Sequence, residues 1–206
     1  MVAKPMVKSS RRFSPPYKPR PAAAPAARDK AASPDSVLYL GIDLGTSQSS
    51  IASSTGIRRT VQSIVAWPKD LVSQKVVKKP IVFGDEALRH RLAVDLYYPL
   101  ERGVVKKGTT RDQEAAMQLI KHLIEMAPRQ SGEKLYVVIG APAEASVVDQ
   151  QSLIDGARDF VDAVMVVSEP FSVAYGLSAL DNSLVIDIGA GTVDLCRMHG
   201  TFPQPG

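Results

Sequence analysis

Residues 37–47 spell VLYLGIDLGTS, an apolar run that reaches an acid and then a glycine turn with two hydroxyls. Such a run predicts a buried strand that ends in a turn. Residues 184–194, LVIDIGAGTVD, repeat this design. Glycines let backbone N–H groups approach phosphate oxygens, hydroxyls add donors, and acids such as Asp43 and Asp187 can hold a hydrated Mg²⁺. The two stretches together predict a pair of loops that clamp one nucleotide.

Other phosphate-binding and metal-binding patterns are missing from the sequence. No G-x-x-x-x-G-K-[ST] occurs, which disfavours a P-loop NTPase. Asp194 stands where a dinucleotide fingerprint would have its third glycine, which disfavours a Rossmann dehydrogenase. Neither H-E-x-x-H nor a Cys/His zinc spacing is present. The single cysteine, Cys196, lies in a strand pattern that predicts a small buried side chain rather than a nucleophile.

The chain has 206 residues, 45% hydrophobic and 22% charged, which is the composition of a folded globular protein. Strands are expected at 37–43, 50–53, 60–67, 135–139, 163–167, 184–188 and 192–197, and helices at 84–93, 110–127, 149–161 and 170–180. The Lys-rich residues 68–80 predict a surface excursion. Apolar strands that alternate with helices predict an α/β fold whose sheet is covered by helices on both faces.

The helix that begins at Thr110 has the clearest pattern in the sequence. Its start, Thr110-x-x-Gln113, fits a capping box, and Pro128 ends it. Its apolar side chains recur at helical spacing, namely Ala115, Ala116, Leu119, Ile120, Leu123 and Ile124. The helix is therefore predicted to be amphipathic, with one apolar face.

A third acidic position lies between the two predicted loops. Residues 168–171, SEPF, put Glu169 at the junction of a predicted strand and a predicted helix. A carboxylate there can orient water for attack on a terminal phosphate if it faces the same cleft as the loops. The alternative is that Glu169 only complements the positive end of the helix, a contribution of about 0.3–1 kcal/mol.

These motifs resemble those of the actin, Hsp70 and sugar-kinase superfamily. The stretches that resemble its phosphate 1, connect 1 and phosphate 2 motifs are residues 41–47, 168–171 and 187–194. The 144 positions that separate Asp43 from Asp187 look like the spacing in actin. Residues 84–87 and 98–105 also resemble actin stretches. The order and the spacing together identify an actin-like chain.

Among bacterial actins, the likeness is to filament proteins that organise magnetosome chains, through residues 67–70, 95–100 and 166–171. The resemblance implies an actin-like, ribonuclease H-like first lobe with a mixed sheet over residues 37–200. It implies ATP and Mg²⁺ as cofactors, self-association into filaments or binding to such a filament, and a cytoskeletal location. In that family ATP binding closes the lobes and favours polymerisation, and hydrolysis destabilises the filament.

The resemblance also implies a role for each motif residue. The residues expected to bind the phosphates are Gly45, Thr46, Ser47, Gly189, Gly191 and Thr192. Asp43 and Asp187 are expected to lie at the metal. Glu169 and Asp187 are expected to be catalytic, by orienting the attacking water.

The likeness ends near residue 200, and residues 201–206 are expected to be an interrupted linker to a second lobe that this sequence lacks. Phosphate loops without a base-binding lobe would hold ATP weakly, because a nucleotide is normally buried between two walls. ATP hydrolysis by the 206 residues alone is therefore left open. A non-catalytic half-actin module that regulates filament assembly stays open as an alternative.

Residues 1–36 form a distinct N-terminal segment. They hold eight of the 25 Lys and Arg and two of the 21 Asp and Glu, a net charge of +6 that leaves −2 for the rest. Seven of the 15 prolines also lie there, so the segment predicts a disordered basic tail. It could contact an acidic partner, a membrane surface or nucleic acid, as in a DNA-segregating actin relative, or only aid solubility. Without a signal-peptide pattern, the chain is expected in the cytoplasm.

Overall fold

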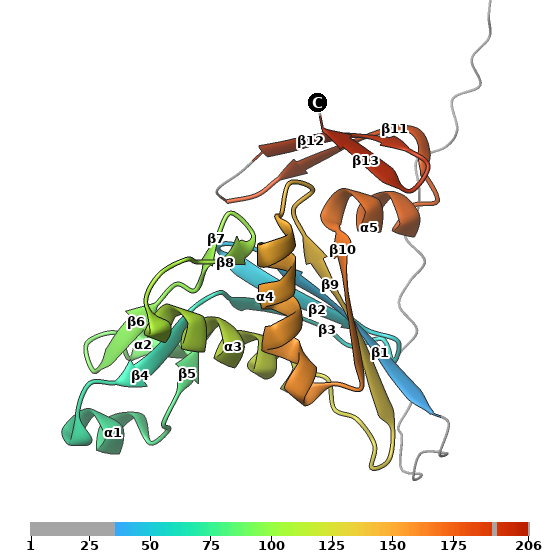
Figure 1. Cartoon of the computed structure of the whole chain (residues 1–206). Coiled ribbons are helices and arrows are strands. Elements are labelled where there is room, and N and C mark those ends of the chain that lie inside the picture. The colour runs from blue at the N-terminus through green and yellow to red at the C-terminus, as the bar shows by residue number, and fades with distance from the viewer. Residues whose placement is uncertain (1–35, 191–192, 206) are drawn as a thin grey trace, which may run out of the picture.

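The computed structural model describes residues 36–190 and 193–205, and its largest element is a five-stranded mixed sheet (Figure 1). In sheet order the strands are β10 (Ala163–Ser168), β9 (Lys134–Ala141), β1 (Val37–Leu44), β2 (Gln48–Ser53) and β3 (Arg58–Gln62). The central strand β1 pairs parallel with β9 and antiparallel with β2, and β9 pairs parallel with β10. The carboxyl ends of β1, β9 and β10 therefore meet at one edge of the sheet.

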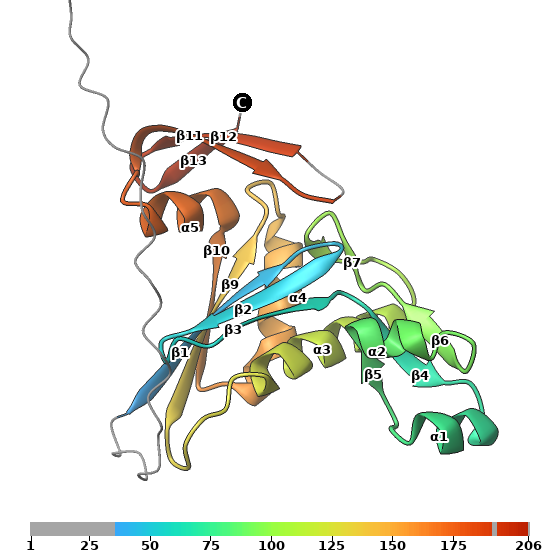
Figure 2. The same ribbon diagram turned by 180° about the vertical axis from the view of Figure 1, so that it is seen from behind.

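Helices α3 (Thr110–Glu125) and α4 (Val147–Ala157) pack on one face of this sheet (Figures 1 and 2). Alternate side chains of β1 are buried beneath them: Leu38, Leu40, Ile42 and Leu44. On the opposite face, Tyr39 and Met165 are each 55% exposed. The two helices thus cover one face of the sheet, whereas we expected helices on both.

The apolar face predicted for α3 is confirmed, since all six of its side chains are buried. The capping box lies one residue earlier than predicted. Thr109 is the N-cap, its Oγ1 accepts from the Asp112 N–H, and the Asp112 carboxylate accepts from the Thr109 N–H at 2.7 Å. The box uses Asp112 because its carboxylate reaches back to the cap, so Thr110 and Gln113 are not the capping pair.

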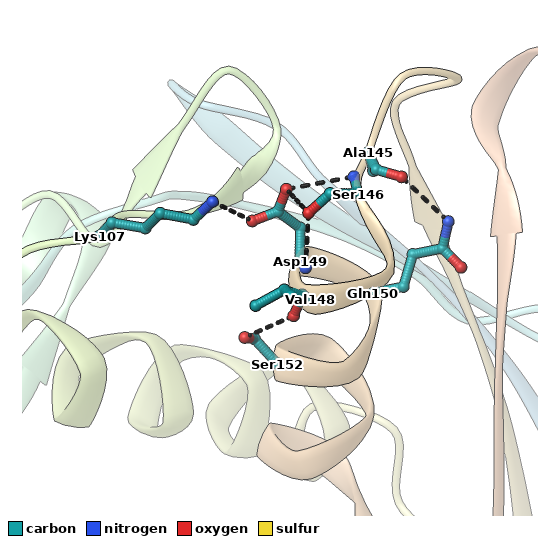
Figure 3. Close-up of polar contacts among 7 residues, drawn as sticks. All are labelled: Lys107, Ala145, Ser146, Val148, Asp149, Gln150 and Ser152. Atoms are coloured by element: carbon teal, nitrogen blue, oxygen red, sulfur yellow. Dashed lines mark hydrogen bonds and ion pairs between the residues drawn. The ribbon is translucent and has the colours of Figure 1, made fainter.

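Helix α4 begins at Val147, two residues before its predicted start, because Ser146 caps it (Figure 3). The Ser146 Oγ accepts from the Asp149 N–H, and the Asp149 carboxylate accepts from the Ser146 N–H and Oγ. Lys107, in the loop before α3, forms an ion pair with Asp149 at 3.1 Å. The start of α4 is therefore tied to the loop that leads into α3.

A smaller three-stranded sheet lies beyond β3. Its elements are β4 (Val65–Pro68), α1 (Leu71–Val77), β5 (Val82–Phe83), α2 (Gly84–Arg89) and β6 (Val94–Tyr97). The single strand predicted at 60–67 is wrong, because the chain breaks at Ser63 into β3 and β4. The predicted excursion at 68–80 contains α1, whose first turn is capped by Asp70 accepting from the Ser73 N–H at 2.7 Å.

The last part of the described chain forms a third sheet, placed beside a short helix. Its elements are α5 (Glu169–Gly176), β11 (Asp181–Ile188), β12 (Val193–His199) and β13 (Phe202–Pro205). Residues 202–205, which we expected to belong to a linker, thus form a strand that pairs antiparallel with β12. The buried residues between this sheet and α5 are Ala174, Val185, Cys196 and Met198.

The outer face of the third sheet is apolar and exposed. Its side chains, between 51% and 76% exposed, are Leu184, Ile186, Ile188, Val193 and Leu195. Within the described part of the chain, no helix has the length and the apolar character needed to cross a membrane. The predicted basic tail, apart from Ser36, lies outside the described residues.

Candidate functional site

The two predicted phosphate loops line one cavity of about 370 Å³. Seven of the predicted site residues lie on its walls, namely Asp43, Gly45, Thr46, Ser47, Glu169, Asp187 and Gly189. The other two, Gly191 and Thr192, lie outside the described residues. The fold therefore brings the ends of β1, β10 and β11 to a common space, although they are far apart in the sequence.

The first loop, between β1 and β2, is supported by two buried serines, Ser49 and Ser63. Ser63 donates through Oγ to the Gly45 carbonyl at 2.6 Å, and its backbone N–H donates to the Ser47 carbonyl at 2.9 Å. Ser49 Oγ lies 2.8 Å from Ser63 Oγ and must be the donor there, since Ser63 uses its hydroxyl proton on Gly45. A Cβ at Gly45 would run into the Gln48 carbonyl oxygen. The loop is thus a fixed turn that requires glycine.

A hairpin whose residues were not predicted to belong to the site also contacts this loop. Its strands are β7 (Leu100–Glu101) and β8 (Val104–Val105), and the turn residues Arg102 and Gly103 have φ of 52° and 74°, as a type I′ turn requires. The Gly103 N–H donates to Thr46 Oγ1 at 3.3 Å. A Cβ at Gly103 would lie 2.7 Å from Pro142 Cγ. Gly103 therefore seats the hairpin tip against the first loop.

The carboxyl groups of the cavity affect one another. Burial raises the pKa of Glu169 to about 7, and the negative charges of Asp43, Asp187 and Asp194 add to the shift. Burial and then Asp187 also raise the pKa of Asp43. Asp194, a motif residue to which we gave no role, pairs with Asp187 across β11 and β12. Near neutral pH, Glu169 can therefore both take up and give up a proton, as acid–base chemistry requires.

Glu169 faces the same cavity as the two loops, which is the arrangement that a water-orienting carboxylate requires. Glu169 begins α5 directly after β10, which places it in the first helical turn and on the wall of the cavity with both loops. A Cβ at Gly140, near the end of β9, would lie 3.2 Å from Glu169 Cγ. Gly140 thus leaves the space that the Glu169 side chain occupies. This glycine ends an apolar run, and nothing in that run marks it as part of a site.

The donor set suits Mg²⁺. Across residues 36–190 and 193–205, no three side chains of His, Cys, Asp or Glu gather as a ready-made metal site. Mg²⁺ does not need one, because it keeps several waters and is held by one or two carboxylates together with substrate phosphates. Asp43 and Asp187 line the cavity and interact electrostatically. They fit such a partly hydrated ion.

A larger cavity of about 700 Å³ shares Asp43, Glu169 and Asp187 with the first. It lies between α5 and β11 on one side and the face of the five-stranded sheet that α3 and α4 leave uncovered on the other. Its remaining wall combines apolar side chains, such as Val138 and Val185, with two arginines, Arg58 and Arg59. The carboxylates thus stand between a small polar space and a larger, more apolar one.

The mixed five-stranded sheet, with two motifs at the ends of its strands β1 and β10 and the third at the end of β11, defines an actin-like α/β lobe. A family model described as MreB/Mbl protein matches residues 38–198. The chain therefore belongs to the MreB/Mbl family of actin-like proteins.

Individual relatives agree with this assignment. The chain is 43% identical over 168 residues to "Actin-like protein MamK" of Magnetospirillum gryphiswaldense, covering 82% of this chain and 47% of that protein. A solved "MamK double helical filament" matches with a TM-score of 0.77 at 42% identity, over 82% of this chain and 52% of that one. A non-polymerising MamK mutant bound to AMPPNP matches over the same shares with a TM-score of 0.73. The chain spans about half the length of the curated relatives it matches.

Proposed function

We propose that this chain forms the phosphate-binding part of an actin-like cytoskeletal protein that binds ATP with Mg²⁺. The observation that carries the proposal is the single cavity lined by two glycine loops and three carboxylates. A MamK relative bound to AMPPNP supports a nucleotide as the ligand. The fixed backbone of the first loop supports phosphate as the group it holds, because preorganised N–H groups and hydroxyls bind anions well.

Each wall of the cavity has a role in this proposal. The backbone and hydroxyls of residues 45–47 bind the β- and γ-phosphates from one side, and residues 189–192 bind them from the other. Mg²⁺, when bound near Asp43 and Asp187, offsets the phosphate charge. Glu169 holds the attacking water by accepting its hydrogen bond, which is the positioning on which phosphoryl transfer depends.

Polymerisation is part of the same proposal. The relatives include a MamK double helical filament at 42% identity, which supports self-association of this chain or its binding to a filament. The likeness to MamK further supports a role in organising magnetosome chains, as a component of the cytoskeleton.

A second candidate is a non-catalytic module that binds a filament and regulates its assembly. The observation that favours it is the exposed apolar face of β11 and β12, where Ile188 is 76% exposed. Exposed apolar patches on folded proteins commonly mark sites of association. This module would bind protein through that face and need no ATP turnover.

The test uses the purified 206-residue chain. A fluorescent ATP analogue is titrated with and without Mg²⁺, phosphate release is followed, and filaments are sedimented. Glu169→Ala should keep nucleotide affinity and lower phosphate release by about 10²-fold or more, the usual effect of removing such a group. Asp159→Ala, an exposed acid outside the cavity, is the matched control.

Failure of the wild-type chain to bind the analogue at any concentration of Mg²⁺ would contradict the proposal. Binding of nucleotide to a sedimentable chain that releases no phosphate would favour the regulatory module instead.

A further inference from the structure

The phosphate cavity has one basic side chain on its described wall. Three carboxylates, Asp43, Glu169 and Asp187, face it, and Arg102 is the lone cation among the described residues that line it. Gly191 and Thr192, outside the described residues, carry no charge. A triphosphate brings several negative charges into this acidic space, so a partner cation besides Mg²⁺ has a clear electrostatic role.

The backbone fixes where Arg102 stands. It occupies the first turn position of the β7–β8 hairpin with a φ of 52°, and the next residue, Gly103, bonds to Thr46 Oγ1. A Cβ built on Gly103 would lie 3.8 Å from Glu169 Oε1, so the hairpin tip is close to the carboxylate as well as to the first loop. Arg102 is therefore held at the Glu169 end of the cavity.

The guanidinium of Arg102 is also available. Two nearby cations have acidic partners, Lys107 on Asp149 and Arg111 on Glu114. No described residue forms an ion pair with Arg102, and its side chain is exposed. An arginine fork offers two parallel donors to a phosphate group, which a neutral turn residue cannot do.

We propose that Arg102 binds the terminal phosphate of the nucleotide and makes this site prefer a triphosphate to a diphosphate. The inference rests on the proposed function, because it assigns a contact within the same cavity. It follows from the position of the hairpin, since Glu169 is the proposed water-orienting residue and the terminal phosphate is the one under attack. The β7–β8 turn is thereby a third phosphate-contacting element beside the two glycine loops.

The experiment measures dissociation constants for AMPPNP and for ADP, each with Mg²⁺, on the 206-residue chain and its variants. Arg102→Ala should weaken AMPPNP binding about 10- to 100-fold, the worth of a charge-assisted hydrogen bond, and change ADP binding less than about threefold. Arg102→Lys should restore part of the AMPPNP affinity, because it keeps the charge and loses the fork. Lys106→Ala, an exposed cation of the same region that does not line the cavity, should change neither constant.

The outcomes separate this inference from the proposed function. Equal losses for AMPPNP and ADP, or no loss for either, overturn the role of Arg102 while nucleotide binding stands. A wild-type chain that binds neither nucleotide overturns both. The exposed turn should accept alanine without unfolding. An unchanged melting temperature of Arg102→Ala would then show that its loss of affinity is local.

Discussion

The two glycine loops of the cavity share one sequence design and differ in how they are held. The loop after β1 receives two hydrogen bonds from Ser63 and bonds to the hairpin through Thr46. In the loop after β11, the described residues Gly189 and Ala190 receive no hydrogen bond from another described element. A shared pattern of acid, glycine and hydroxyl therefore predicts a loop, whereas its rigidity depends on residues elsewhere in the chain.

Substitution of Gly45 should destabilise the first loop more than any other change at this site. Gly45→Ala puts a Cβ against the Gln48 carbonyl oxygen, a backbone atom that cannot move without moving β2. We expect a loss of about 3 kcal/mol in the free energy of unfolding, the upper part of the usual range for overpacking. Urea unfolding followed by circular dichroism measures it. Gly176→Ala is the control, because no atom lies within 4 Å of its added Cβ.

Removal of the serine support should have the next largest effect. Ser63→Ala leaves the Gly45 carbonyl and the buried Ser49 hydroxyl without this partner, at a cost of about 1–2 kcal/mol. Ser50→Ala removes an exposed hydroxyl pair with Thr60 and should cost less than about 0.5 kcal/mol. Equal unfolding midpoints for the two variants would show that the support from Ser63 is unimportant.

The acidic wall makes stability depend on pH. Glu169 keeps its proton up to a pKa of about 7 in the folded state and only to 4.5 when unfolded, so the folded state binds more protons between these values. The free energy of unfolding of the nucleotide-free chain should therefore fall as pH rises from 4.5 to about 7. Glu169→Gln should flatten this fall in melting scans at a series of pH values.

Asp112 and Asp149, whose pKa values are lowered by their capping hydrogen bonds, affect the free energy of unfolding in a separate, more acidic pH range. Their contribution is lost as pH falls below 3.8. A wild-type profile that rises from pH 4.5 to 7 would contradict the assignment to Glu169.

The smallest effect on stability is expected on the outer face of the β11–β12 sheet. Ile186 is 56% exposed, so Ile186→Lys should change the free energy of unfolding by less than about 0.5 kcal/mol. The same substitution should reduce concentration-dependent association, seen by light scattering, because it interrupts an apolar patch. Val185→Lys, on the buried side of the same strand, is the contrasting variant and should unfold this sheet.

Local patterns predicted the parts of the fold that local physics decides. The apolar run at β1 and the helical spacing of α3 are such cases, and both elements lie where expected. The break at Ser63 was missed, because it depends on a bond to the Ser47 carbonyl across the sheet. Helix α1 was not predicted, because its lysines indicated a surface excursion. Asp70 and Ser73 nevertheless have the spacing of a helix cap.

The residues of the candidate site likewise include some that the sequence could predict and some that it could not. The motif residues on loops could be selected from their types and order, and those described line one cavity. Arg102, Gly103 and Gly140 could not, because their roles arise from a hairpin and a strand that the fold brings to the loops from elsewhere. Their individual functions remain predictions for the experiments above.

The separate core of the β4–β5–β6 sheet has a consequence for the evolution of this chain. One side of this sheet has buried residues of its own, whereas Val65 on the other side of β4 belongs to the core beneath β1. The residues of the separate cluster are Ile64, Ala66, Val77, Val82, Ala87 and Val94. Exposed positions on α1, such as Val72 and Val76, lie in this unit and not on the cavity wall. Substitutions at the exposed positions of α1 therefore lie away from both Asp43 and Asp187, so the outer surface of this unit can change while the cavity keeps its carboxylates.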